Sequence, residues 1–234
     1  MKRLSLIDSH GKDRLLLRNP TGYKGGFWQT YYLDEIYCHS ASTENEAFSV
    51  MSEATRKGKL DVSLTHSPLL DGVPATRVDL QVWSYNKPFM LIRHKTTNVS
   101  EQMIKNVKLF EFIDFDIGGP ASYKDDKGVY DPKKGLMTVY DGNPLAVGVA
   151  SRPNPDRWEI SNPNKLLVHE KAPDLRNNLK LGPMDVATGL QWNLGDFAPQ
   201  ETGSIDIVIA SAASLKEVEA LIPEGWKQFS RKIR

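Results

Sequence analysis

Period-two alternation of apolar and polar residues is the feature that most constrains this chain. The run 59–67, KLDVSLTHS, alternates leucine and valine with polar residues, and the run 76–83, TRVDLQVW, does the same. Successive side chains of a strand point to opposite faces, so such a strand packs one face and exposes the other, as in antiparallel sheets. Strand-like runs recur between turn-forming residues, and we predict about thirteen strands. Among them, the runs 26–39 and 165–169 are each predicted as one strand.

Helical signals are scarce. The segment 214–221, SLKEVEAL, opens with Ser214 as an N-cap, and Glu217 three residues later completes a capping box. An apolar stripe follows at helical spacing, and Pro223 is predicted to end the helix. One further helical turn is predicted over 183–188, where Pro183 suits the first helical position.

The chain of 234 residues shows no repeat, low-complexity tract or linker, so we predict a single domain over residues 1–234. Many strands with one short helix predict an all-β fold. We expect a large two-sheet antiparallel β-sandwich with one short C-terminal helix, although the pattern alone also allows a barrel.

Composition excludes several functional classes. Thirty basic and twenty-nine acidic residues give a net charge of +1, which offers no support for binding to nucleic acid or to an acidic membrane surface. No apolar run approaches the roughly 20 residues of a membrane span or the length of a secretory signal, so a cytoplasmic location is expected. The single cysteine and the lack of H-x-H spacing predict no metal and no cofactor.

Three stretches together carry a resemblance to a known family. They are TNVSEQMIKNVKLFEFIDFDIG (97–118), YDPKKGLMTVY (130–140) followed by LAVGVAS (145–151), and LQWNLGDFAPQETGSIDIVIASAA (190–213). Their order resembles the N-terminal β-supersandwich domain of the glucoamylase and glucodextranase family of glycoside hydrolases, which has a galactose mutarotase-like fold. The resemblance implies a free-standing homologue of that domain. In the family the catalytic carboxylates belong to a separate helical domain, for which this chain has neither the length nor the helical periodicity.

The resemblance implies a non-catalytic accessory or carbohydrate-associated protein that presents a sheet face to sugar or to a protein partner. That partner would be a separate glycosidase catalytic chain or a second copy of this chain. One alternative is a mutarotase-like enzyme that pairs His94 or His66 with Glu159 or Glu170. Another alternative is a homodimeric structural protein. No complete catalytic motif is present, and no catalytic residue is predicted.

Five residues are candidates for ligand binding. Trp28, Tyr32 and Trp158 are predicted to offer rings on which a pyranose stacks, and the alternative is that they fill the core. Asp114 and Asp116 stand two residues apart on one predicted strand, so they share a face. Such a pair could bind a cation, act as an acid and a base, or cap loop amides at the end of the strand.

Glu111 interrupts an otherwise apolar row on the same predicted strand. A buried carboxylate must be paired or must have a raised pKa. We therefore expect an ion pair with Arg77 or Arg93 on a neighbouring strand, or a position at a sheet edge.

Overall fold

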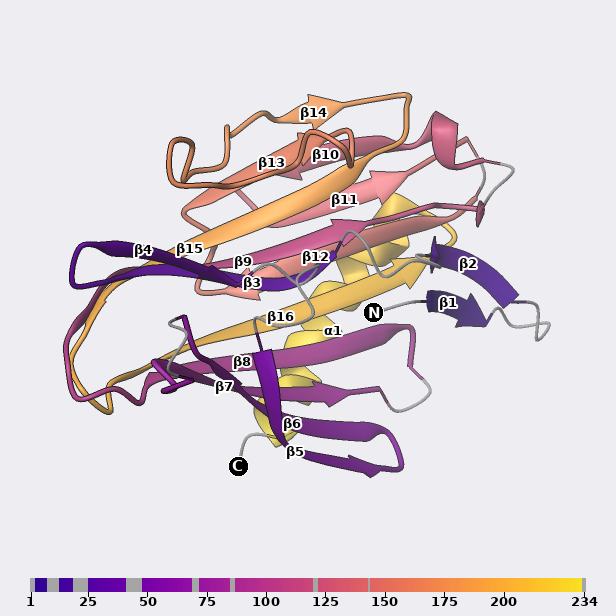
Figure 1. Cartoon of the computed structure of the whole chain (residues 1–234). Helices are drawn as coiled ribbons and strands as arrows, with labels where there is room; N and C mark the ends of the chain where they lie inside the picture. Colours follow the sequence, from indigo (N-terminus) through magenta and orange to yellow (C-terminus); the bar gives the residue numbers. More distant parts are fainter. Residues whose placement is uncertain are drawn as a thin grey trace.

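The computed structural model describes residues 3–7, 13–18, 25–40, 48–68, 72–84, 87–119, 122–142 and 144–232. Two antiparallel sheets lie face to face, and neither of the described sheets closes on itself (Figure 1). The predicted all-β sandwich is therefore confirmed. No helix of the described part is long and apolar enough to cross a membrane.

The larger sheet has nine strands. In spatial order they are β14 (Lys180–Leu181), β10 (Lys127–Asp131), β11 (Leu136–Tyr140), β12 (Ala146–Arg152), β16 (Thr202–Ala212), β8 (Phe89–Asn98), β7 (Thr76–Trp83), β6 (Lys59–His66) and β5 (Phe48–Arg56).

The smaller sheet has five strands. In spatial order they are β13 (Arg157–Ser161), β15 (Ala187–Phe197), β9 (Ile104–Asp114), β3 (Gly25–Leu33) and β4 (Ile36–Ser40). A separate hairpin joins β1 (Arg3–Ile7) to β2 (Asp13–Arg18), and η2 (Tyr123–Asp125) is a single 3-10 turn.

The main core lies between the two sheets. Leu109 and Ile113 of β9 meet Val147 of β12 and Ile207 of β16, and Trp192 of β15 is also almost fully buried there.

The alternation predicted for β7 is confirmed, because Val78 is buried and Leu80 and Val82 of the same face pack on this core. Along β6 the two faces do not differ in this way, because residues 59–64 are all half-buried. The polar residues that alternate with the apolar rows of β6 and β7, Asp61, Ser63, Asp79 and Gln81, lie on the outer face.

Helix α1 (Leu215–Lys232) packs across the outer face of β8, β12 and β16. The N-cap is confirmed, since Ser214 Oγ accepts a hydrogen bond from the Glu217 N–H at 3.3 Å. The capping box is not closed as predicted, because the Glu217 carboxylate accepts its hydrogen bond from the Ala213 N–H, at 3.2 Å. The predicted end at Pro223 is wrong, because the helix continues beyond this residue. Pro223 is exposed on the solvent side, whereas the residues that face the sheet are buried on both sides of it: Val218, Ile222, Gly225 and Phe229. Their burial outweighs the loss of one backbone hydrogen bond.

Three local predictions are also wrong. The run 26–39 is a hairpin rather than one strand, because Asp34 adopts a left-handed conformation (φ 53°) that turns the chain between β3 and β4. The run 165–169 is a loop, although Leu166 and Val168 are buried on the outer face of the smaller sheet beside Phe112. Residues 183–188 form no helix, and β15 begins at Ala187.

Candidate functional site

A histidine and a carboxylate meet between the two sheets. His94 Nε2 of β8 lies 3.2 Å from Glu111 Oε2 of β9, and both side chains are less than a tenth exposed. The ring of His94 also stacks on Phe27 of β3, with 4.6 Å between ring centroids. Neither nitrogen of His94 makes a hydrogen bond with a described residue, so the two side chains are in contact without hydrogen-bond geometry.

The partner predicted for Glu111 is therefore wrong. Arg93 donates two hydrogen bonds to the carboxylate of Asp206, at 2.6 and 2.7 Å, and Arg77 donates to Asp79 at 3.1 Å. Both arginines belong to the outer face of the larger sheet. Alternation along β8 places His94, next to Arg93, on the inner face, and this is why a histidine reaches Glu111.

A second polar contact lies in the interior. Tyr31 OH and His66 Nδ1 are 2.8 Å apart, and both residues are almost fully buried. Burial lowers the pKa of His66 to about 4, and the nearby His39 adds to the shift. Burial likewise raises the pKa of Tyr31 far above its usual value. At neutral pH the imidazole is thus uncharged, and its Nδ1 atom shares one hydrogen bond with the phenol of Tyr31.

None of the predicted histidine and glutamate pairs is formed. The carboxylate of Glu159 binds the guanidinium of Arg176 and accepts a hydrogen bond from its backbone N–H at 3.0 Å. Glu170 is exposed on a loop. His66 instead contacts Tyr31, and His94 contacts Glu111. Neither histidine therefore lies against Glu159 or Glu170.

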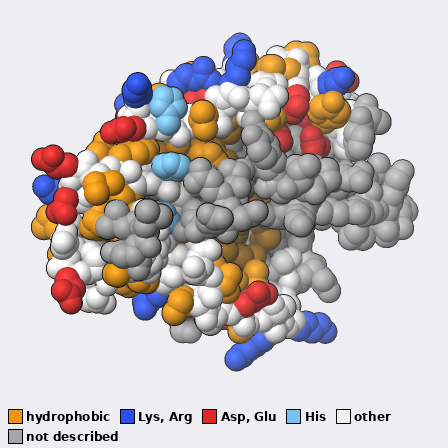
Figure 2. All heavy atoms as spheres, in the orientation of Figure 1, with side chains coloured by type: hydrophobic (Ala, Val, Ile, Leu, Met, Phe, Trp, Pro, Cys, Tyr) orange, Lys and Arg blue, Asp and Glu red, His pale blue; other side chains and the backbone are white. Residues whose placement is uncertain are grey.

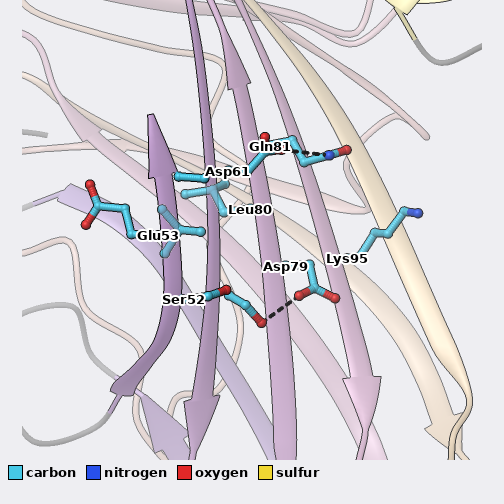
Figure 3. A pocket seen from close by; sticks show the side chains of 10 residues that line it. Ser52, Glu53, Asp61, Asp79, Leu80, Gln81 and Lys95 are labelled. Atoms are coloured by element: carbon cyan, nitrogen blue, oxygen red, sulfur yellow. Dashed lines mark hydrogen bonds between the residues drawn. The ribbon is translucent and has the colours of Figure 1, made fainter. Parts of the chain in front are cut away.

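A pocket of about 360 Å³ lies over strands β5–β8. Its polar lining comes mainly from the outer face of the larger sheet: Ser52, Asp61, Ser63, Asp79, Gln81 and Lys95. Ser63 Oγ donates to Asp79 at 2.7 Å, and Gln81 Nε2 donates to Asp61 at 2.9 Å (Figure 3). Lys59 binds Asp61 at 2.9 Å and lowers the pKa of its carboxyl group. The carboxylate of Asp61 is therefore ionised at neutral pH, and hydrogen bonds hold both aspartates in place.

The structure separates the three aromatic candidates. Trp28 is buried on the outer face of the smaller sheet, edge-on to Phe112. Trp158 is half-buried and stacks on Tyr130, with 4.1 Å between centroids, and Tyr32 is half-buried against Tyr37. None of the three lines the pocket over β5–β8.

The two aspartate candidates are brought together with a third. Asp114, Asp116 and Asp185 offer oxygen atoms that all lie within 4.8 Å of one another. Asp185 shortly precedes β15, whose Ala187 pairs with Asp114. Burial raises the pKa of Asp185, and Lys124 partly opposes this.

Asp126 lies close to this group and is fully buried. Burial raises its pKa to about 8, the Ile117 N–H opposes that shift, and the charges of Asp141, Asp116 and Asp185 add to it. The sequence analysis missed Asp126 and Asp185, because only strand pairing brings them to the end of β9. Figure 2 shows acidic side chains close together at the upper right.

The chain matches no protein-family model and no curated protein. Solved structures do match it. A bacterial glucoamylase complexed with acarbose is 12% identical, with a TM-score of 0.64 over 88% of this chain and 28% of the glucoamylase chain. A GalM/aldose epimerase homologue from C. elegans is 10% identical, with a TM-score of 0.57 over 91% of this chain and 92% of the homologue. These likenesses confirm the galactose mutarotase-like supersandwich fold that the sequence resemblance predicted.

Proposed function

We propose that this supersandwich is a non-catalytic carbohydrate-binding module and that sugar binds in the pocket over β5–β8. The observation that carries the proposal is the set of fixed polar groups in that pocket. Asp61 and Asp79 can accept hydrogen bonds from sugar hydroxyls, since each carboxylate oxygen keeps a lone pair beyond its protein bond. Gln81 of β7 pairs with Asp61 of β6 and lies two residues from Asp79, and Lys95 of β8 supplies a cationic donor opposite Asp79.

The size of the pocket suits a small ligand. Its volume is at the lower end of the range for small-molecule sites, roughly 300–1,000 Å³. None of the described residues that line it is aromatic, so we expect hydrogen bonds to supply most of the affinity. We therefore expect weak binding, with a Kd of about 1 mM for a short oligosaccharide.

The position of the His94 and Glu111 pair supports a non-catalytic role. A mutarotase needs an acid and a base on either side of a sugar ring. These two side chains are less than a tenth exposed and pack against Phe27, so no sugar reaches them in this conformation. We expect that the purified chain does not accelerate mutarotation of a fresh α-anomer in polarimetry. Acceleration that is lost in His94→Leu would contradict this expectation.

A glycan array with the full chain tests the proposed site. Asp79→Ala and Gln81→Ala should each weaken binding at least about tenfold, because each removes a direct hydrogen bond. Asp131→Ala is the matched control, since Asp131 lies on β10 at the other side of the same sheet. It should bind as the wild type does.

Trp28→Ala and Trp158→Ala test the aromatic alternative from the sequence. Loss of binding in either tryptophan variant, with Gln81→Ala unaffected, would move the site away from β5–β8. Absence of binding to every glycan would remove the carbohydrate proposal. A separate glycosidase catalytic chain would then be the partner to test, by co-purification.

A further inference from the structure

The pocket over β5–β8 offers a ligand more hydrogen-bond acceptors than donors. Each carboxylate oxygen of Asp61 and of Asp79 binds one protein donor and keeps a further lone pair. Glu53 of β5 also lines the pocket and adds a third carboxylate. Among the side chains that the structure describes in this lining, carboxylates therefore provide most of the free hydrogen-bonding capacity.

Few donors remain in the lining for an acceptor group of the ligand. Ser63 Oγ donates its one proton to Asp79, and Gln81 Nε2 donates one of its two protons to Asp61 (Figure 3). The donors left among the described lining side chains are the Ser52 hydroxyl, the second amide proton of Gln81, and Lys95. A ligand group that mainly accepts hydrogen bonds therefore finds few partners here.

Two cations stand beside the aspartates but outside the lining. Lys59 binds Asp61 at 2.9 Å, and Arg77 binds Asp79 at 3.1 Å, while neither cation lines the pocket. They offset the charge of the aspartates, so the excess of acceptors decides which ligand fits, rather than a large net charge. Lys59 also lowers the pKa of the Asp61 carboxyl group and so keeps it ionised. A charged donor binds an ionised carboxylate about twice as strongly as a neutral donor binds a neutral acceptor.

An amine is the sugar substituent that best matches such a lining. A primary ammonium has three donors and no acceptor, whereas a hydroxyl has one donor and an N-acetyl group adds a carbonyl acceptor. A carboxylate or a sulfate brings only acceptors, with a charge of the same sign as the aspartates. We infer that the pocket selects sugars with a free amine, such as glucosamine, over neutral, N-acetylated and acidic sugars. This inference rests on the proposed function of the pocket.

Isothermal titration of the full chain with matched tetramers tests the inference. The β-1,4-linked tetramers of glucose, N-acetylglucosamine and glucosamine share one backbone and carry at C2 a hydroxyl, an N-acetyl group and an amine. At about pH 6 the glucosamine tetramer should bind at least about tenfold more tightly than the other two, because its hydrogen bonds are charge-assisted. We expect the sugar amine to titrate near an α-amino group, at about pH 8, so the preference should be lost at about pH 9.5.

The outcomes separate this inference from the proposed function. Equal binding of the three tetramers would overturn the amine preference and leave the carbohydrate proposal standing. Absence of binding to every glycan would remove both. Spermidine, which carries amines without a sugar, should bind more weakly than the glucosamine tetramer, and equal affinity would overturn the assignment to a sugar.

Two variants locate the preference. Asp61→Asn and Asp79→Asn each keep an acceptor oxygen and lose the charge, so each should reduce the preference for the amine at least about tenfold. Affinity for the glucose tetramer should change little, and this shows that the variants are folded. Asp131→Asn is the matched control, because it removes one carboxylate from β10 at the other side of the same sheet. Equal loss in Asp131→Asn, or an undiminished preference in both pocket variants, would overturn the assignment.

Discussion

At the scale of single residues, the interior of this sandwich encloses polar side chains among apolar ones. His94 and Glu111 occupy positions on the inner faces of β8 and β9 that apolar residues fill elsewhere in the core. Burying two polar side chains costs desolvation free energy, which their mutual contact only partly offsets. Each side chain therefore depends on the other.

A double-mutant cycle measures that dependence. His94→Leu alone should lower the free energy of unfolding by about 3 kcal/mol, because it leaves Glu111 buried without a partner. The double variant His94→Leu/Glu111→Leu should lose clearly less than the sum of the two single variants. Urea denaturation of the four proteins gives all the values. Strict additivity would show that the two side chains do not interact in solution.

His66 gives a prediction about pH. Its folded pKa of about 4 lies below the ordinary value of 6.5, so the unfolded chain binds the proton more tightly. The stabilising contribution of neutral His66 is therefore complete above about pH 6.5 and is lost as the pH falls toward about 4. Its full size is up to about 3 kcal/mol. Other buried groups titrate in the same window, so the wild type must be compared with a variant.

His66→Gln serves as that variant, because its amide oxygen can accept the hydrogen bond from Tyr31. Urea denaturation of both proteins at about pH 7.5 and about pH 4.5 gives the difference in unfolding free energy. This difference should shift in favour of the variant on acidification, by up to about 3 kcal/mol. A difference that stays constant with pH would show that His66 is not held neutral in the fold.

At the scale of elements, helix α1 gives opposite predictions for neighbouring positions. Pro223 is exposed inside the helix, so Pro223→Ala restores a backbone hydrogen bond and should raise stability by at least about 1 kcal/mol. Helix propensity alone predicts a gain for Gly225→Ala as well. A Cβ at Gly225, however, would lie 2.6 Å from Val208 Cγ1 of β16. Gly225→Ala should therefore lose about 1–3 kcal/mol.

Thermal melts of Pro223→Ala and Gly225→Ala show whether stability rises in the first variant and falls in the second. Lys227→Ala, at an exposed position of the same helix, is the control and should stay near the wild type. A gain in Gly225→Ala would show that α1 does not pack tightly against β16.

Elements with a local signal could be predicted from the sequence, and those decided by tertiary contacts could not. The alternation of apolar and polar residues identified β6 and β7, and the pair Ser214 and Glu217 identified the start of α1. The end of α1 was mispredicted, because burial of Phe229 against the sheet overrides the helix-breaking effect of Pro223. The hairpin at Asp34 was missed, because no glycine marks its left-handed turn.

At the scale of the whole molecule, the same distinction applies to the candidate sites. Asp114 and Asp116 were found because they are near in sequence. Asp185 reaches them only through the pairing of β9 with β15, and Asp126 only through the packing of one sheet on the other. The pocket over β5–β8 was also missed, since its polar residues are those that alternation assigns to an ordinary solvated face.

The main core predicts that the chain unfolds as one unit. It draws on residues from Tyr31 to Ile209 and on both sheets, so neither sheet keeps its buried face without the other. A single transition of 234 residues should show an unfolding enthalpy of about 160 kcal/mol near 60 °C. The van't Hoff and calorimetric enthalpies should agree.

Three tryptophans report on unfolding in three separate parts of the molecule. Trp83 lies beneath α1, Trp192 between the sheets and Trp28 on the outer face of the smaller sheet. Variants that keep only one of these as a fluorophore, with Phe elsewhere, should melt at the temperature at which the strand signal is lost in circular dichroism. A van't Hoff enthalpy near half the calorimetric value, with Trp83 melting apart from Trp192, would instead mean two cooperative units. The cluster between α1 and the outer face of the larger sheet would then melt separately from the main core.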